Sequence, residues 1–221
     1  MKSLDFSFIV PYLPQLIEAA GVTLKIGVLA FMLALCISLI VGALRVSNIP
    51  KVFKVFLSAY VEIFRGTPLL VQLFVIYYGL PPFGISMESY TAAIIGLALN
   101  CGAYMSEIVR ASIMSVDRGQ YEAAYSLGYN RISTIIYIIL PQALRIAVPP
   151  FMNYFSTILK DTSLISVISI AEVTRIGNQI YARTLRPFEI YITLGVFYFV
   201  MTYLVTLLSK VLERRTSLWS Q

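Results

Sequence analysis

Long apolar segments constrain the fold of this chain more than any other feature. A membrane-spanning helix needs about 20 mostly apolar residues, because the bilayer core offers no water to unpaired backbone groups. Such segments cover residues 22–44, 52–80, 90–113 and 188–212. Another starts after the polar link that follows residue 113, and we expect Pro141, Pro149 and Pro150 to interrupt it. Only 13% of the residues are charged, and the mean hydropathy is +0.81. The sequence therefore predicts an all-α integral membrane bundle of five transmembrane helices, with residues 1–221 forming one domain.

The first twenty residues do not continue this pattern. Pro11 and Pro14 break the apolar stretch 6–17, so we expect residues 1–20 to lie along the membrane interface. They lack the basic start and cleavage site of a signal peptide. Cys36 and Cys101 lie inside apolar segments without a CxxC spacing, and the chain has no histidine. We therefore expect neither a metal site nor a disulfide.

The distribution of basic residues predicts the orientation in the membrane. Arginine and lysine are enriched in cytosolic links, and here they flank alternate spans: Arg45, Lys51 and Lys54, then Arg110, Arg118 and Arg131, then Lys210, Arg214 and Arg215. This pattern places the N-terminus outside and the C-terminus in the cytosol. Three arginines fall on the outer side and oppose the rule (Arg175, Arg183 and Arg186), although Glu172 and Glu189 are near enough to offset them.

The polar link 115–141 carries a fixed-spacing pattern: E-A-A, three residues, G, nine residues, I-x-L-P. Its members are Glu122, Ala123, Ala124, Gly128, Ile138, Leu140 and Pro141. Asp117 can cap a first helix, with Gln120 completing a capping box, and Asn130 can cap a second. Gly128 suits the left-handed position between them. The pattern resembles the EAA loop of ABC-importer membrane subunits, which implies a cytosolic coupling loop on which a separate ATPase docks.

The fourth span contains a break. The apolar run from Ile146 ends at Lys160-Asp161, and a second short run, 164–171, follows. Interrupted helices at membrane depth require protein or a water-filled cavity around them and are frequent at transporter substrate sites. The alternative is a simple helix end with a Lys-Asp pair at the outer interface.

Ionisable residues inside spans are candidates for function. Glu62 with Arg65, and Glu107 with Arg110, are three apart and can pair on one helix face. Structural pairing therefore explains them as well as substrate contact does. Candidate substrate-binding residues are Asp161, Asn153, Tyr104, Ser163, Glu107 and Glu172.

A narrower resemblance covers most of residues 20–212. It is carried by 62–72 (EIFRGTPLLVQ), 102–104 with Glu107 and Arg110, 119–124 (GQYEAA), 140–143 (LPQA) and 159–164 (LKDTSL). These stretches resemble the permeases of the histidine, arginine and glutamine transport subfamily. The resemblance implies a type I ABC-importer permease fold (MetI-like) in a prokaryotic plasma membrane. It also implies as partners a second permease subunit, two cytosolic ATPase subunits and an extracytoplasmic amino acid-binding protein.

The chain lacks a Walker-type phosphate loop, G-x-x-x-x-G-K-[ST], and any nucleophile–base pattern. We therefore expect a translocation subunit, not an enzyme, with no cofactor, no catalytic residue and no nucleic-acid partner. Asp161, Glu107 and Glu172 would suit a basic amino acid, because a buried cation requires a paired anion. Glutamine or another polar amino acid is the alternative within the family. An ion-coupled secondary transporter and a membrane scaffold are rival classes.

Overall fold

A computed structural model describes residues 4–217, with side chains as far as Val211. Arg214 and Arg215, which entered the orientation argument, lie beyond the described side chains. The regular elements within 4–217 are all helical, as expected. They are η1 (Ser7–Tyr12), α1 (Leu13–Val46), α2 (Lys51–Gly66), α3 (Leu69–Phe74), η2 (Val75–Gly79), η3 (Pro81–Phe83), α4 (Ser89–Met114), α5 (Arg118–Ser126), α6 (Arg131–Thr134), η4 (Ile135–Ile139), α7 (Leu140–Asp161), η5 (Thr162–Ile168), α8 (Val173–Thr184) and α9 (Pro187–Ser217).

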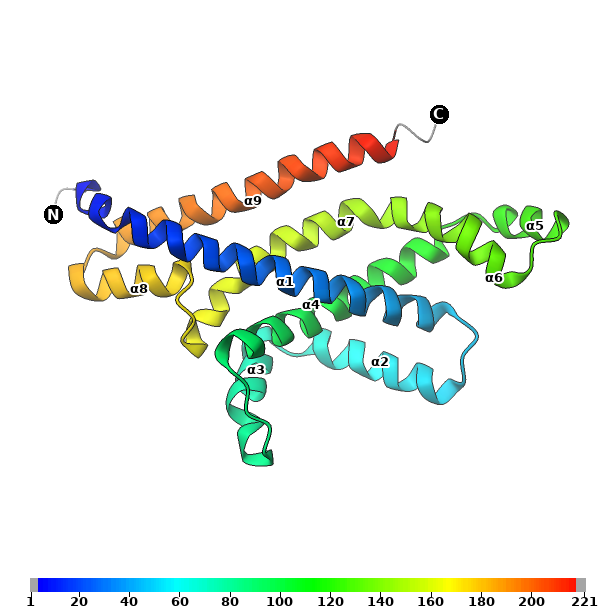
Figure 1. Cartoon of the computed structure of the whole chain (residues 1–221), viewed down its shortest axis with the longest axis horizontal. Coiled ribbons are helices and arrows are strands. Elements are labelled where there is room, and N and C mark those ends of the chain that lie inside the picture. The colour runs from blue at the N-terminus through cyan, green and yellow to red at the C-terminus, as the bar shows by residue number, and fades with distance from the viewer. Residues whose placement is uncertain (1–3, 218–221) are drawn as a thin grey trace.

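Four long helices run lengthwise through the molecule, namely α1, α4, α7 and α9 (Figure 1). The N-terminus, α8 and the start of α9 lie at one end. The link after α1, the end of α4 and the helices α5 and α6 lie at the other. In the described part of the chain, four helical stretches are long and apolar enough to span a membrane, and a bent helix pair brings the number to five. The predicted five spans are thus present if that pair counts as one.

Small residues allow α1 and α4 to pack closely along much of their length. The buried face of α1 includes Ala30, Ala34, Ser38 and Gly42, and α4 opposes it with alanines, glycines and serines. A Cβ atom built on Gly42 would lie 2.6 Å from the backbone oxygen of Ser106. Close backbone approach through small side chains is the usual way in which helices associate in lipid.

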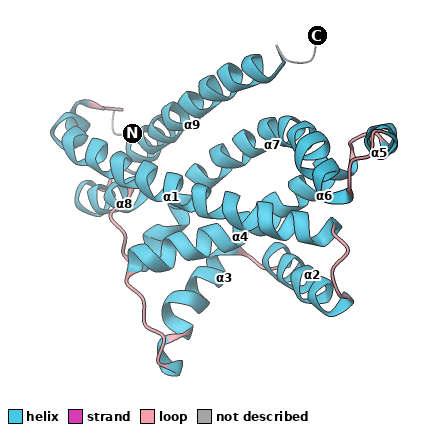
Figure 2. Cartoon of the chain, turned by 45° about the vertical axis from the view of Figure 1, so that its right-hand side comes forward, coloured by secondary structure: helices cyan, strands magenta, loops and turns pink. Residues whose placement is uncertain are grey.

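The second span is broken, which corrects the expectation of one continuous segment over 52–80. Helices α2 and α3 meet at 109°, and α3 projects away from the lengthwise helices (Figure 2). Pro68 has no N–H to continue the ladder of α2. Buried amides stabilise the bend: Gln72 Nε2 and Asn100 Nδ2 both donate to the carbonyl of Phe64, at 2.9 and 3.0 Å.

Helix α7 passes through Pro149 and Pro150 without ending, so the expected interruption by prolines is wrong. Membrane helices tolerate proline where neighbouring groups satisfy the freed carbonyls. The break that follows is where the sequence placed it. After Asp161 the chain tightens into the 3₁₀ helix η5, and it turns at Ser169, whose φ is +71°.

The N-terminal segment differs from the single interfacial stretch expected for residues 1–20. Helix α1 begins at Leu13, with Pro14 in its first turn, where proline is favourable. Ile9, Leu16 and Ala19 are buried against α7, α8 and α9. Residues 1–3 lie outside the described part of the chain.

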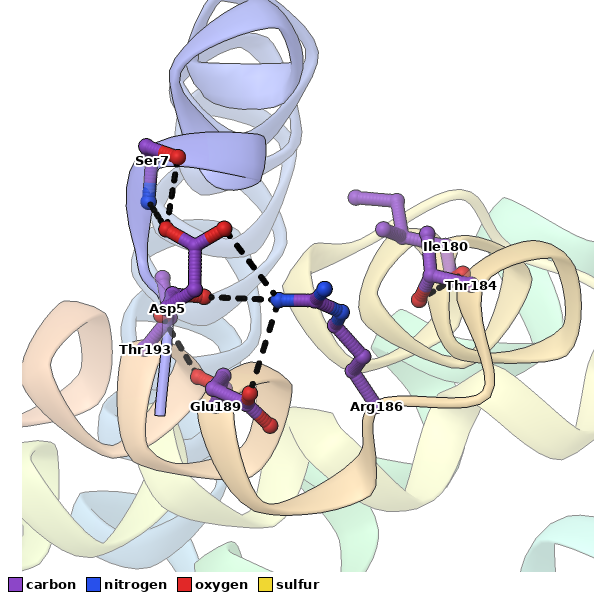
Figure 3. Close-up of polar contacts among 7 residues, drawn as sticks. All are labelled: Asp5, Ser7, Ile180, Thr184, Arg186, Glu189 and Thr193. Carbon is purple, nitrogen blue, oxygen red and sulfur yellow. Dashed lines mark hydrogen bonds and ion pairs between the residues drawn. The ribbon is translucent and has the colours of Figure 1, made fainter. Parts of the chain in front are cut away.

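Arg186 fastens this segment to the start of α9 (Figure 3). Its guanidinium donates to the backbone oxygen of Asp5 at 3.2 Å, forms ion pairs with Asp5 and Glu189, and covers the ring of Phe8. Hydrogen bonds from Ser7, supported by Arg186, hold the pKa of Asp5 below its usual range. Arg186, one of the three arginines that opposed the charge rule, is therefore neutralised within the chain.

Candidate functional site

The link after α4 forms two short capped helices, as the sequence predicts. The Asp117 side chain accepts a hydrogen bond from the N–H of Gly119, and that of Asn130 accepts one from Ser133. Each cap satisfies a backbone donor at the start of a helix. The link is thus a defined projection at one end of the bundle (Figures 1 and 2).

Gly128 makes the bend between these helices. Its φ is +84°, in the left-handed region that glycine favours. The N–H of Gly128 donates to Tyr125 and that of Tyr129 donates to Ala124, which together form a Schellman motif. Ala124 is buried, whereas Glu122 and Ala123 are exposed. The exposed pair offers a partner one carboxylate and one small side chain beside accessible backbone.

Contacts near the start of α7 attach the projection to the bundle. Gln142 Nε2 donates to Gln120 Oε1 at 3.1 Å, so the Gln120 side chain pairs here and the expected capping box does not form. Val116, Ile139 and Ala143 make a small buried cluster, with Ile138 packed on it. Leu140 and Pro141 begin α7. Helix α5 is therefore connected to the end of α4 and the start of α7.

A second candidate site lies where α7 ends and α2 breaks. Asp161 is half-buried, and among the described residues its side chain has no hydrogen-bond or ion-pair partner. Tyr154, two turns earlier on α7, stacks on Tyr104 of α4 with ring centroids 5.7 Å apart. The Arg65 guanidinium lies over the Tyr104 ring, 5.3 Å from its centroid.

Tyr104 also caps the broken helix. Its hydroxyl donates to the backbone oxygen of Arg65 at 3.1 Å. The Thr67 hydroxyl donates to the carbonyl of Ile63. The side-chain amides of Gln72 and Asn100 donate to that of Phe64. The carbonyls left free at the end of α2 are therefore held by side chains, and this fixes the place of Arg65.

The remaining predicted residues do not all gather here. Asn153 lies exposed on α7, and Ser163 is half-buried in η5, two residues after Asp161. Glu107 lies on α4 toward the coupling-loop end and is paired with Arg110 and, at 2.7 Å, with Arg45 of α1. The predicted Glu107–Arg110 pair is confirmed. No ion pair joins Glu62 to Arg65 among the described side chains.

Glu172 is fully enclosed at the opposite end of the bundle. Its carboxylate accepts from the N–H groups of Thr174 and Arg175 and from the hydroxyl of Tyr198. Burial raises the pKa of this carboxyl, and the three hydrogen bonds oppose that shift. Glu172 therefore caps α8 and joins it to α9.

Sequence reasoning missed two residues of the Asp161 cluster. Tyr154 lies seven residues before Asp161 and thus on the same helix face. Arg65 directly precedes the Gly66-Thr67-Pro68 break, where a side chain leaves a helix end, but it was considered only as a partner for Glu62.

A broken span, a half-buried carboxylate without a partner and a capped projecting loop together define the membrane subunit of a solute transporter. The chain belongs to the family described as "Binding-protein-dependent transport system inner membrane component", whose profile matches residues 18–218. It is a multi-pass permease of the amino acid ABC-transporter type.

Relatives agree on this class but differ in substrate. The chain is 43% identical to the L-cystine transport system permease TcyB of Bacillus subtilis, over 87% of this chain and 82% of that one. It is 40% identical to the glutamine permease GlnP of Escherichia coli (96% and 97%) and 35% identical to the arginine permease ArtQ of Bacillus subtilis (96% and 97%).

A solved amino acid ABC transporter crystallised with histidines matches the fold with a TM-score of 0.90, at 41% identity over 96% of this chain and 99% of that one. The methionine transporter MetNI matches with 0.80 at 21% identity, over 93% of this chain and 98% of its own. The expected MetI-like permease fold is confirmed.

Proposed function

We propose that this chain is the translocation subunit of an ATP-driven importer of polar amino acids, with its N-terminus outside and its C-terminus in the cytosol. Two ATPase subunits dock on the coupling loop through the exposed Glu122 and Ala123. A second permease subunit and an external binding protein complete the complex. The helix ends that carry the basic residues lie at one end of the bundle, which supports this orientation. These residues flank the link after α1 (Arg45, Lys51 and Lys54) and the loop after α4 (Arg110, Arg118 and Arg131).

The observation that carries the substrate proposal is the half-buried Asp161 carboxylate, which makes no hydrogen bond or ion pair among the described residues. It lies seven residues after Tyr154 on α7, and the Tyr154 ring stacks on Tyr104, whose ring lies beside the Arg65 guanidinium. An amino acid zwitterion requires one anion and one cation, because buried charges are stable only when paired. We place the substrate ammonium at Asp161 and its carboxylate toward Arg65, with Tyr104, Asn153 and Ser163 orienting the remainder.

The argument for a basic substrate rested on three carboxylates, and two of them are engaged elsewhere. Glu107 is paired with two arginines, and Glu172 accepts three hydrogen bonds. One free carboxylate suffices for the ammonium that all amino acids share. We therefore propose the polar amino acids as a class, including glutamine and cystine beside the basic ones.

The test is transport into vesicles that contain the complete complex, with glutamine, arginine and cystine in competition. Asp161→Asn should weaken all three by about 10- to 100-fold, since a hydrogen bond to a charged group contributes roughly 1.5–3 kcal/mol. Glu62→Gln removes an exposed carboxylate from α2 and serves as the matched control. Unchanged apparent affinity for all three amino acids in the Asp161 variant would remove this residue from the site. A loss confined to arginine would instead establish Asp161 as the partner of a side-chain cation.

A further inference from the structure

A cavity of about 500 Å³ lies between the coupling loop and the ends of two spans. Its apolar wall comes from Ala43 and Val46 of α1, Ile113 and Met114 of α4, and Ile139 and Leu140 beyond the loop. None of the candidate substrate residues lines it, so it is separate from the Asp161 cluster. Its volume is that of a site for a small organic ligand.

The mouth of this cavity opens on the apolar surface of the bundle. Met114 lines the cavity and is 65% exposed, and Ile135 lines it and is 39% exposed. Ile136, next along the chain, is also exposed. Since α1 ends at Val46 and α4 at Met114, the mouth lies where two spans end. An occupant with an apolar chain can therefore enter from the bilayer.

The polar side of the cavity is positively charged. Arg131 lines it, and in the described part of the chain this guanidinium has no ion-pair or hydrogen-bond partner. Tyr121 and Tyr125 also line the cavity, and no acidic residue is among the lining residues. An arginine with neighbouring hydroxyl donors is suited to a phosphate group.

An apolar cavity that opens toward lipid, with one unpaired guanidinium and two phenols among its lining groups, matches a molecule with an acyl chain and an anionic head. We propose that this cavity binds an anionic phospholipid, with its acyl chain against α1 and α4 and its phosphate at Arg131. The lipid then fills the space between the coupling loop and the ends of α1 and α4. Basic pockets between membrane helices are known to bind anionic head groups.

The experiment uses tryptophan fluorescence and brominated lipids, whose bromine atoms quench a nearby indole. Trp219→Phe removes the native tryptophan, and Met114→Trp places a reporter in the cavity. Ile135→Trp is a second reporter in case the first variant folds poorly. The protein is reconstituted with brominated phosphatidylglycerol or brominated phosphatidylcholine. We expect binding to the anionic lipid to be about fivefold tighter, the effect of one basic residue near a charged head group.

Three controls locate the effect. Arg131→Gln should abolish the preference, whereas Arg118→Gln, which removes another exposed arginine of the same loop, should leave it intact. A reporter at Phe199→Trp, on the exposed face of α9, should show no preference. Added inorganic phosphate should leave quenching unchanged, because it lacks the acyl chain.

Each opposite result would overturn the proposal. Equal quenching by the two lipids at the cavity reporters, or a preference that survives Arg131→Gln, excludes an anionic lipid at this site. Loss of the preference on adding phosphate identifies a free-phosphate site. Loss of quenching by both lipids when the ATPase subunit binds shows that protein covers the cavity. None of these results bears on whether the chain transports amino acids.

Discussion

At the scale of single residues, chemical type alone does not assign a role. Asp161, Glu107 and Glu172 are all carboxylates in or beside apolar segments, so the sequence alone predicts the same role for each. Their surroundings separate them: two arginines hold Glu107, two backbone N–H groups and a phenol hold Glu172, and Asp161 keeps free acceptors. A carboxylate whose acceptors are already used has little to offer a substrate.

Gly42 provides a prediction on helix contact. In Gly42→Ala the new methyl group would lie 2.6 Å from the carbonyl oxygen of Ser106, a backbone atom that can move away only if the helices separate. We expect a loss of about 1–3 kcal/mol of stability. Gly21→Ala, on the same helix with nothing within 4 Å, should be neutral or stabilising by up to about 1 kcal/mol. Thermal unfolding in detergent compares the two, and equal melting temperatures would contradict the close contact.

At the scale of elements, features that depend on neighbouring residues were predictable and features that depend on distant ones were not. The caps at Asp117 and Asn130, the bend at Gly128 and the break after Asp161 follow from local preferences and were found. The bend between α2 and α3 is a partial exception: Gly66-Thr67-Pro68 is a local signal that was not used, whereas the support from Asn100, which donates to Phe64, comes from 36 residues away. The link from Glu107 to Arg45 spans 62 residues. Tyr154 and Arg65 both contact the Tyr104 ring, although they lie on different helices far apart in the sequence.

The coupling loop provides the second prediction. At Gly128 there is open space, so a side chain meets no atoms there, but a left-handed backbone disfavours it by about 1–2 kcal/mol. Gly128→Val should reduce association with the ATPase subunit and amino acid-stimulated ATP hydrolysis while the chain still inserts. Gly128→Asn should restore both in part, because asparagine tolerates this conformation. Stimulated hydrolysis at the original level in Gly128→Val would separate the bend from coupling.

The α2–α3 bend provides the third prediction. Gln72 Nε2 donates to three oxygens, those of Phe64 and the backbone and hydroxyl of Thr67. Gln72→Glu keeps nearly the same shape but replaces the donor NH2 group with an oxygen, which cannot donate to these three oxygens unless it is protonated. We expect a loss of at least about 1–3 kcal/mol, the cost of leaving buried groups unpaired. The same exchange at the exposed Gln15 is the control. Similar melting temperatures for both variants would mean that the amide does not support the bend.

At the scale of the whole molecule, the two candidate sites lie apart, with the coupling loop at one end and the Asp161 cluster where α7 ends. Helices α4 and α7 connect them: α4 reaches from Tyr104 to the loop, and α7 from the loop to Asp161. A change at the loop can therefore move both walls of the Asp161 cluster as rigid bodies. Helix closure and opening of this kind is a frequent mode of long-range coupling.

Accessibility provides the fourth prediction. In a background without Cys36 and Cys101, a cysteine at the exposed Asn153 should react with an impermeant reagent from outside only when the ATPase subunits are trapped with ATP. The control is Tyr78→Cys, in η2 and 56% exposed, which should react whether or not nucleotide is bound. Labelling of Asn153→Cys that ignores nucleotide would exclude alternating access at this depth.

The Arg186 cluster has a consequence for the order in which the chain is made. The bond from Arg186 to Asp5 joins residues 181 positions apart. Ribosomes add about 5–20 residues per second, so Arg186 is synthesised roughly 10–40 s after Asp5. During that time the first helix enters the membrane with its leading segment unfastened. The contact that closes this end of the bundle is thus among the last that synthesis permits.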